Sequence, residues 1–243
     1  MILGVRFDRL TRAQAISAME GAFGSRQALK VYLLNAHTLN LASADLGFRN
    51  VLNGGDLVLN DGLGVQIGSL LGGRPFFDNL VGTDLTPEVC ERAARLGVSV
   101  FLLGGEDGVP ERAAEALRRK ISGIQIAGVH HGYFGESEER CLVEQINRSG
   151  AGIVLVGFGN PRQELWIHRN GPHLRCDLCI GVGGLFDHLS GKLQRAPSWV
   201  RRIGMEWFFI LMCQPYKWRR YLIGNPLFLF RLLADRLQRD RWA

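Results

Sequence analysis

The chain has 243 residues, of which 47% are hydrophobic and 21% are charged, as is usual for a soluble globular protein with room for a substantial core. Its five cysteines have no regular spacing, which argues against a disulfide framework and favours a reducing compartment. The opening stretch MILGVRFDRL carries charges where a secretory signal would be apolar, so no such signal is expected.

The net charge of +6 is unevenly distributed along the chain. Residues 192–243 contain eleven Lys or Arg against three Asp or Glu, a balance of +8, whereas residues 1–191 contain 18 basic and 20 acidic side chains, a balance of −2. Because the basic charge is confined to the C-terminal part, the composition argues against nucleic-acid binding. It indicates a specialised C-terminal surface instead.

Strand and helix patterns alternate through the first 190 residues. A helix is expected at 11–23, where Thr11 and Gln14 form a capping-box pattern. Beyond it, short apolar runs typical of buried strands occur at 28–36, 56–60, 98–105, 123–134, 152–159 and 178–187. The helices expected between them lie at 38–53, 63–71, 108–121 and 137–150.

This alternation predicts an α/β fold with a mostly parallel sheet, because parallel neighbours need long crossover connections that are usually helical. No repeat and no low-complexity linker interrupts it. We expect the α/β core to occupy residues 1–191, with residues 192–243 as a helical, basic and aromatic C-terminal appendage.

The appendage interleaves aromatic, aliphatic and arginine residues. Its longest apolar runs, WFFILMC and PLFLF, are far shorter than the roughly 20 residues that a membrane-spanning helix needs. Large apolar side chains beside cationic ones favour a helical segment that lies in the interface of an anionic membrane. The alternative is an ordinary amphipathic helix that packs on the core.

Glycine-rich turns follow three of the expected strands, in LLGGEDGVPE, VGFGNPRQE and GVGGLFDHLSG. In open α/β sheets, ligands bind beyond the carboxyl ends of the strands, where glycine lets backbone N–H groups approach a phosphate. None of the three is a Walker A loop or a G-x-G-x-x-G motif, and glycine in such turns often serves packing alone. Together they favour a pocket for a nucleotide or a sugar nucleotide.

Asp61 stands at a fourth strand end, in LVLNDGLGV. Asn-Asp-Gly is common turn chemistry and Asp also caps helices, so a purely structural role is one interpretation. A catalytic role is the other. The six histidines lack the spacing of metal ligands, so no metal is expected. The candidates for chemistry are therefore the carboxylates of Asp61, Asp84, Glu164 and Asp187.

Eight motifs occur in the order found in the WecG/TagA/CpsF glycosyltransferases: NAHTLNLASAD, GDLVLNDGLGV, NLVGTDL, VFLLGG, HHGYF, GFGNPRQELWI, GVGGLFDHLSGKLQRAP and GMEWFF. The chain resembles this family from about Leu3 to Asn225. The resemblance implies a Rossmann-like core that transfers a sugar, with inversion, from a UDP-sugar to a polyprenyl-diphosphate-linked saccharide. It also implies a role in bacterial teichoic acid, enterobacterial common antigen or exopolysaccharide synthesis, and an appendage that binds the membrane and completes the site.

The resemblance identifies Asp61 with the family's proposed catalytic base. Direct displacement needs one carboxylate within hydrogen-bond reach of the acceptor hydroxyl. A nucleotide diphosphate leaving group needs positive charge, which arginines would supply where no metal is bound. The arginines expected to stabilise the diphosphate are Arg195, Arg201, Arg202, Arg219 and Arg220. The residues expected to bind substrate are Asn35, Thr38, Asn60, Gly62, Gly82, Thr83, Asp84, Gly104, Gly105, Gly159, Pro161, Gln163, Glu164, Gly183, Gly184 and Asp187.

The chain departs from the family at one strand end. Many relatives have Thr-Pro-Asn where this sequence has Leu33, Leu34 and Asn35. Asn35 carries over, but the threonine does not, and Thr38 is only a candidate substitute. Arg162 also stands where relatives vary, so the adjacent Gln163 and Glu164 carry over more firmly.

The expected partners are a UDP-sugar, a polyprenyl-diphosphate-linked saccharide and an anionic membrane surface, with no cofactor and no nucleic acid. We expect a cytoplasmic protein, peripheral on the inner face of the cell membrane, and a homo-oligomer is compatible with the sequence. One alternative function is a non-catalytic nucleotide-binding module tethered to the membrane. A dinucleotide-dependent oxidoreductase is disfavoured by the lack of a G-x-G-x-x-G motif and a ribose-binding acid.

Overall fold

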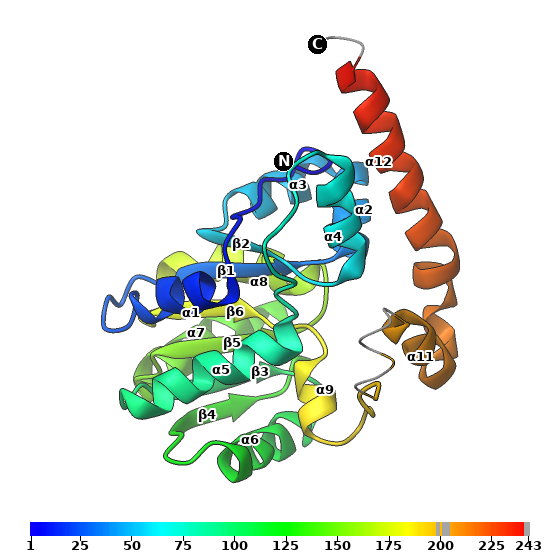
Figure 1. The fold of residues 1–243 in the computed structure, drawn as a ribbon. Coiled ribbons are helices and arrows are strands. Elements are labelled where there is room, and N and C mark those ends of the chain that lie inside the picture. The colour runs from blue at the N-terminus through cyan, green and yellow to red at the C-terminus, as the bar shows by residue number, and fades with distance from the viewer. Residues whose placement is uncertain (198–199, 201–204, 241–243) are drawn as a thin grey trace.

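The structure is a computed structural model that describes residues 1–197, 200 and 205–240. Figure 1 shows a parallel sheet with helices on both faces and a helical C-terminal segment beside it. The described strands form one six-stranded sheet in the order β2-β1-β6-β5-β3-β4. Their bounds are β1 (Leu29–Leu34), β2 (Leu57–Asn60), β3 (Val100–Gly104), β4 (Ile126–His130), β5 (Ile153–Gly157) and β6 (Leu178–Gly181).

Each strand pair in the sheet is parallel, which confirms the predicted fold class. Side chains of β1 alternate between the two faces: Val31 and Leu33 belong to one hydrophobic cluster, and Tyr32 and Leu34 to the other. Burial on both faces explains why the strands read as continuous apolar runs and not as alternating ones.

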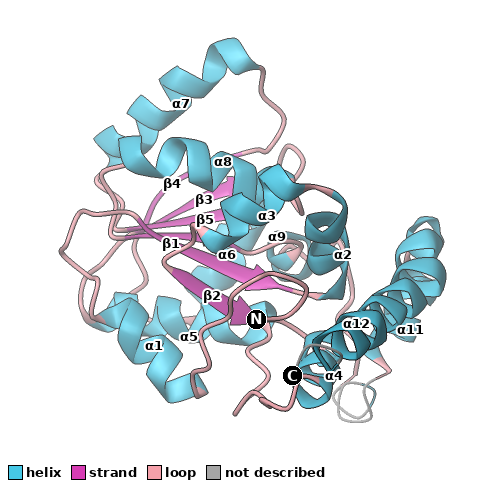
Figure 2. Ribbon diagram, turned by 90° about the horizontal axis from the view of Figure 1, so that it is seen from above, coloured by secondary structure: helices cyan, strands magenta, loops and turns pink. Residues whose placement is uncertain are grey.

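Four helices cover the first face of the sheet, and Figure 2 shows two of them, α1 and α5, together on that side. Their bounds are α1 (Arg12–Glu20), α5 (Gly82–Arg95), α6 (Val109–Lys120) and α9 (Leu185–Leu189). The predicted capping box at Thr11 is present in α1, where its side chain accepts from the Gln14 N–H. The second face is covered by α2 (Ala36–Ala44), α3 (Leu46–Asn53), α4 (Leu63–Leu71), α7 (Glu136–Ser149) and α8 (Arg162–Asn170).

The sequence patterns misplaced several boundaries. The single helix expected at 38–53 is two helices, because Asp45 adopts extended backbone and its side chain caps α3 by accepting from the Phe48 N–H. Helices α5 and α8 were not predicted. Pro87 lies inside α5, where a proline normally argues against a helix.

The C-terminal segment consists of α11 (Glu206–Cys213), a 3₁₀ turn (Pro215–Lys217), a π-helical turn (Arg219–Gly224) and α12 (Asn225–Asp240). Helix α12 packs on α2 and α4. Phe228 and Leu232 are 1% and 5% exposed and belong to the hydrophobic cluster of the second face. Asn40 of α2 donates to the Gly224 carbonyl at 2.6 Å and accepts from Arg231 at 2.9 Å, so the segment is joined to the core by specific bonds.

No helix in the described part of the chain is long and apolar enough to cross a membrane. All five cysteines are free thiols. Cys90, Cys176 and Cys179 are buried, and burial raises the pKa of the Cys90 and Cys176 thiols to about 12. Cys141 on α7 and Cys213 on α11 are exposed.

Candidate active site

A cavity of about 890 Å³ lies at the carboxyl edge of the sheet, between the turns that follow the strands and the C-terminal segment. Residues from all six strand ends contribute to it, and Trp207, Lys217 and Arg220 contribute from the C-terminal side. Open α/β sheets place their ligand sites at this edge. The structure therefore has a cavity at the edge of the sheet where the sequence predicts a ligand site.

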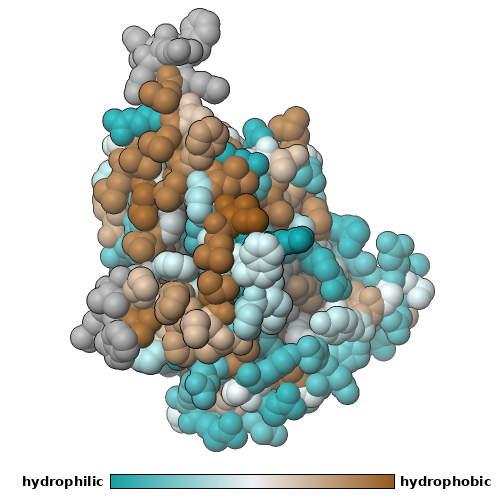
Figure 3. Space-filling model, turned by 90° about the vertical axis from the view of Figure 1, so that its right-hand side faces the viewer, coloured by the Kyte–Doolittle hydropathy of each residue, from teal (hydrophilic) through white to brown (hydrophobic). Residues whose placement is uncertain are grey.

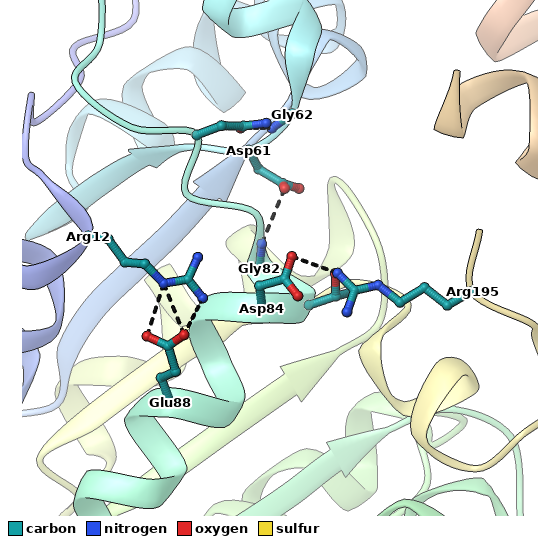
Figure 4. Close-up of polar contacts among 9 residues, drawn as sticks. Arg12, Asp61, Gly62, Gly82, Asp84, Glu88 and Arg195 are labelled. Carbon is teal, nitrogen blue, oxygen red and sulfur yellow. Dashed lines mark hydrogen bonds and ion pairs between the residues drawn. The ribbon is translucent and has the colours of Figure 1, made fainter. Parts of the chain in front are cut away.

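Asp61 lies in the wall of this cavity, at the residue that follows β2. Its backbone N–H donates to the Leu34 carbonyl at 2.8 Å, which extends the pairing of β1 and β2 by one bond. Its side-chain Oδ1 accepts from the Gly82 N–H at 3.2 Å (Figure 4). Gly62 then turns the chain with φ of +95°, a conformation that favours glycine, and its N–H donates to the Asn79 side chain at 2.8 Å.

Three predicted substrate-binding residues stand where α5 begins: Gly82, Thr83 and Asp84. Gly82 and Thr83 line the cavity, whereas Asp84 is not among its described lining residues. Arg195 Nη2 lies 2.7 Å from Asp84 Oδ2 and 2.9 Å from Thr83 Oγ1. The sequence predicts that Arg195 binds the diphosphate. In the structure its guanidinium bonds to the first turn of α5.

Asn35 lines the cavity at the end of β1, while the proposed threonine substitute does not. Thr38 is fully buried, and its hydroxyl lies 3.3 Å from Asn35 Oδ1. Asn35 Oδ1 also accepts from the N–H groups of His37 and Thr38, so it caps α2. Thr38 thus lies in the core, one helical turn inward from the cavity wall, and its assignment to substrate stays a prediction.

Asn60 is likewise buried and outside the cavity lining. Its Nδ2 donates to the Asp78 carbonyl at 2.8 Å and so fixes the loop before α5. Gly104 is also outside the described lining. A Cβ there would lie 2.4 Å from the Gly157 carbonyl oxygen, so this glycine permits close packing of β3 against β5.

The other predicted glycines do line the cavity: Gly62, Gly105, Gly159, Gly183 and Gly184. Gln163 lines it too, and its Oε1 accepts from the Gly183 N–H at 2.9 Å. Pro161, which follows a cis peptide bond, is outside the lining, although its neighbours Asn160 and Arg162 are within it.

Glu164 is fully buried behind Gln163 and is not among the described lining residues. Its Oε1 accepts from Gln163 Nε2 at 2.9 Å and from Asn160 Nδ2 at 2.5 Å. Burial raises the pKa of Glu164 to about 7, against the opposing effect of these bonds. Glu164 therefore orients two side chains that line the cavity, those of Asn160 and Gln163.

Of the five predicted arginines, Arg220 alone lines the cavity within the part of the chain that the structure describes. Arg219 lies over the Trp218 ring, with its Cζ 5.4 Å from the ring centroid. Arg201 and Arg202 lie outside the described residues.

Lys217, Lys192 and His37 also line the cavity and were missed by the sequence analysis. Burial and the nearby Arg220 charge lower the pKa of Lys217. Burial, with the Arg220 and Lys217 charges, lowers the pKa of His37 to about 4. Burial is the larger cause of both shifts, and the neighbouring positive charges add to it, so these basic groups lie near one another in the cavity wall.

Asp187 lines the cavity as predicted. Its Oδ1 lies 4.0 Å from Lys192 Nζ, which contacts Glu106 more closely at 2.7 Å. Among the described residues, no group of three or more His, Cys, Asp and Glu side chains could hold a metal ion. The cavity thus combines carboxylates, glycine turns with approachable backbone N–H groups, and the partly buried cations Lys217 and Arg220.

The chain matches the model of the glycosyl transferase WecG/TagA/CpsF family over residues 1–242. Three similar proteins are each named N-acetylglucosaminyldiphosphoundecaprenol N-acetyl-beta-D-mannosaminyltransferase. Those of Bacillus spizizenii and Bacillus subtilis are both 34% identical to it, over 72% and 80% of this chain and 67% and 75% of theirs. That of Staphylococcus aureus is 28% identical over 95% of this chain and 91% of its own length. The chain described here belongs to the glycosyl transferase WecG/TagA/CpsF family.

Proposed function

We propose that this protein is an inverting, metal-independent glycosyltransferase that moves a sugar from a UDP-sugar to a polyprenyl-diphosphate-linked saccharide. The observation that supports it best is that the Asp61 carboxylate shares one cavity with the Lys217 and Arg220 cations and the glycine turns. A carboxylate can take the proton of an attacking hydroxyl, and cations can stabilise a departing diphosphate.

The proposed reaction is a single displacement. The acceptor hydroxyl oxygen attacks the anomeric carbon, its proton passes to Asp61, and the bond from that carbon to the UDP oxygen breaks with its electron pair. The leaving diphosphate gains charge as that bond breaks, so Arg220 and Lys217 would bind it more strongly then than in the ground state. The backbone N–H groups of the turns at Gly105, Gly159 and Gly183 would hold the rest of the nucleotide.

The names of the relatives indicate which substrates to test first. Each is named for transfer of a β-linked N-acetylmannosaminyl group to N-acetylglucosaminyl diphosphoundecaprenol. A β-linked product from an α-linked nucleotide sugar is an inversion, which agrees with a single displacement. We propose UDP-N-acetylmannosamine and this lipid-linked acceptor as the first pair for this chain.

We further propose that the protein is peripheral on the cytoplasmic face of the cell membrane. Figure 3 shows apolar side chains gathered on the face that carries the C-terminal helices. The exposed apolar residues of this segment are Met205, Phe208, Met212, Tyr216, Trp218, Leu222, Ile223, Leu227, Leu229, Phe230, Leu233 and Leu237. The acceptor's lipid tail would reach the cavity from that side.

The decisive experiment measures sugar transfer and UDP binding for Asp61→Asn. We expect turnover to fall by about 10²–10⁴-fold, as is usual for loss of a general base, while UDP affinity changes little. Asp56→Asn at the opposite end of β2 is the matched control, since Asp56 lies outside the cavity lining and asparagine can still accept the Lys30 N–H bond. Near-normal turnover of Asp61→Asn would leave Asp61 as a turn residue. UDP binding without sugar transfer by the wild type would favour the non-catalytic nucleotide-binding module instead.

A further inference from the structure

We propose that Arg195 is a positioning residue for the Asp61 carboxylate, and that it acts through Asp84 and the first turn of α5. The inference rests on the proposed function, in which Asp61 is the general base. It gives Arg195 a different role from the diphosphate contact that the sequence suggested.

The position of Arg195 excludes it from the wall that the ligand would touch. It is not among the described residues that line the cavity. Its Nη2 instead bonds to Asp84 Oδ2 at 2.7 Å and Thr83 Oγ1 at 2.9 Å. Its Nε is buried and has no hydrogen-bond partner in the described chain, so only the end of the guanidinium is engaged. The Arg195 and Asp84 side chains are 29% and 34% exposed, so the ion pair is partly shielded from water.

The Arg195 contact connects two distant parts of the chain at the catalytic turn. Arg195 lies 112 residues from Thr83 in sequence, between α9 and the C-terminal helices. Gly82, the first residue of α5, donates its N–H to Asp61. Figure 4 shows the Asp61 side chain beside the Gly82 amide, and the Asp84 side chain beside Arg195 at the same turn. Arg195 therefore holds the N-terminal end of α5, and that end in turn holds the Asp61 carboxylate.

Electrostatics gives Arg195 a second effect on Asp61. Asp61 and Asp84 both lie at the N-terminal turn of α5, where the helix dipole favours negative charge. The guanidinium of Arg195 balances the Asp84 charge at 2.7 Å. Without Arg195, that negative charge would be unbalanced beside the turn that holds Asp61.

Other charged groups face this region and set the background. Arg12 acts on Asp84 and Asp78 at longer range, but its hydrogen bonds go to Glu88, at 3.0 and 2.9 Å from Nε. The remaining charged or titratable groups on the cavity wall are His37, Glu106, Arg162, Asp187, Lys192, Lys217 and Arg220, with His188 and the Tyr133 and Tyr221 hydroxyls. Arg195 makes the 2.7 Å ion pair with Asp84, so it is the group to change.

The test compares the pH dependence of kcat/KM for Arg195→Ala, Arg195→Lys and Arg195→Ala combined with Asp84→Asn. Transfer is assayed with UDP-N-acetylmannosamine and N-acetylglucosaminyl diphosphoundecaprenol, and UDP binding is measured separately. We expect Arg195→Ala to lower kcat roughly 10-fold to 100-fold and to move the acid limb of the profile upward by about one pH unit. The lysine variant and the double variant should return the acid limb toward its wild-type position. The first restores the positive charge at position 195, and the second removes the negative charge at position 84.

Arg12→Ala is the matched control, because it breaks a comparable ion pair one turn further along α5 (Figure 4). We expect it to lower the melting temperature about as much as Arg195→Ala does, but to move the acid limb less. The inference is overturned if Arg195→Ala leaves the acid limb of the kcat/KM profile in place. It is also overturned if Arg195→Ala weakens UDP binding and the added Asp84→Asn change fails to restore that binding. The second result would return Arg195 to the diphosphate. If Asp61→Asn is fully active, the proposed base itself has failed, which is a separate outcome.

Discussion

The Asp61 carboxylate oxygen lies 3.2 Å from the backbone nitrogen of Gly82, across 21 residues of sequence. The bond joins the end of β2 to the beginning of α5, so the helix determines where the carboxylate points. A Cβ on residue 82 would lie 2.7 Å from Leu33 Cδ1 on β1, so the end of this buried side chain would have to move. The Asp61 turn, the helix and the neighbouring strand are thus packed as one unit.

Gly82→Ala should displace the beginning of α5 and with it the Asp61 carboxylate. We expect kcat to fall at least 10-fold, since small misplacements of a catalytic group are costly, and the stability to fall by about 1–3 kcal/mol from overpacking. Steady-state kinetics and urea unfolding measure the two effects. Gly171→Ala is the control, since a Cβ there meets only Lys30 side-chain carbons at ordinary contact distance. A Gly82→Ala enzyme with unchanged kcat would contradict the packing argument.

UDP binding should raise the pKa of His37. In the ligand-free protein burial, with the Arg220 and Lys217 charges, lowers it to about 4. A diphosphate bound by those two cations offsets their charge, so the protonated imidazole becomes easier to form. NMR titration of the His37 ring signals with and without UDP measures the shift. Lys217→Met in the ligand-free protein should shift the pKa in the same direction. An unchanged His37 titration in saturating UDP would place the diphosphate elsewhere.

Glu164→Gln should make the protein more stable at neutral pH while leaving UDP affinity unchanged. The pKa of this carboxyl is raised to about 7 in the folded protein, from 4.5. The folded state therefore holds the proton more tightly, so stability falls as pH rises from about 4.5 to about 7 and levels off above it. At about 1.4 kcal/mol per unit, the gain for the glutamine variant at pH 8 is at most about 3 kcal/mol.

Urea unfolding of the wild type and Glu164→Gln between pH 4.5 and 8 checks this prediction. The difference in unfolding free energy should be near zero at pH 4.5 and should grow across the window. Glutamine keeps an oxygen that can accept from Asn160 and Gln163, so the network survives. A difference that is independent of pH would show that Glu164 does not titrate in this range.

Sugar transfer should continue in EDTA. The reaction as proposed uses the Lys217 and Arg220 cations in place of a metal ion, so removal of divalent ions should change kcat/KM less than about twofold, well under the 1.4 kcal/mol that a tenfold effect represents. The rate is measured after dialysis against EDTA and again after addition of Mn²⁺ or Mg²⁺. Loss of activity that either ion restores would contradict the metal-independent mechanism.

Phe228 and Phe230 should respond in opposite ways, although both are phenylalanines of α12. Phe228 is 1% exposed and Phe230 is 69% exposed. Phe228→Ala should cost about 3–5 kcal/mol of stability as a core truncation. Phe230→Ala should leave stability unchanged but weaken binding to anionic vesicles, because it removes apolar area from the membrane face. Vesicle sedimentation and thermal unfolding separate the two. Equal vesicle binding by wild type and Phe230→Ala would mean that α12 does not enter the interface.

The strand pattern and the position of Asp61 could be predicted from sequence because both depend on local signals. A buried run followed by Asn-Asp-Gly is readable without knowing the rest of the fold. The sequence named Arg220 among five candidate arginines, but it could not show which basic residues of the appendage line the cavity. Lys217 and Arg220 line the cavity while Arg219 between them in the sequence does not, and that difference depends on how the π-helical turn docks against α2. Lys217, Arg219 and Arg220 are chemically alike and close in sequence, so the sequence alone does not show which of them faces the cavity.

The sequence also could not show which residues of one motif face the cavity and which face the core. Asn35 lines the cavity and Thr38 is buried, because a helix begins between them and rotates successive side chains by about 100°. The sequence predicts that six aromatic residues of the appendage contact a membrane: Trp207, Phe208, Phe209, Trp218, Phe228 and Phe230. The structure shows that Phe228 belongs to the core instead, since α12 packs on α4 through it. Whether residues 1–191 fold without the appendage stays a prediction of the sequence pattern.

The arrangement of the five thiols makes the protein suitable for site-selective labelling with thiol-reactive dyes. Cys90, Cys176 and Cys179 are sealed in the core, where burial raises their pKa and suppresses reaction with maleimides. Cys141 and Cys213 are exposed on different helices, α7 and α11. An environment-sensitive dye on Cys213 would report from the segment that borders the cavity, while the same dye on Cys141 would report from the helical layer over the sheet. Fluorescence from the two sites, in single-cysteine variants, would reveal the orientation of the enzyme on a bilayer.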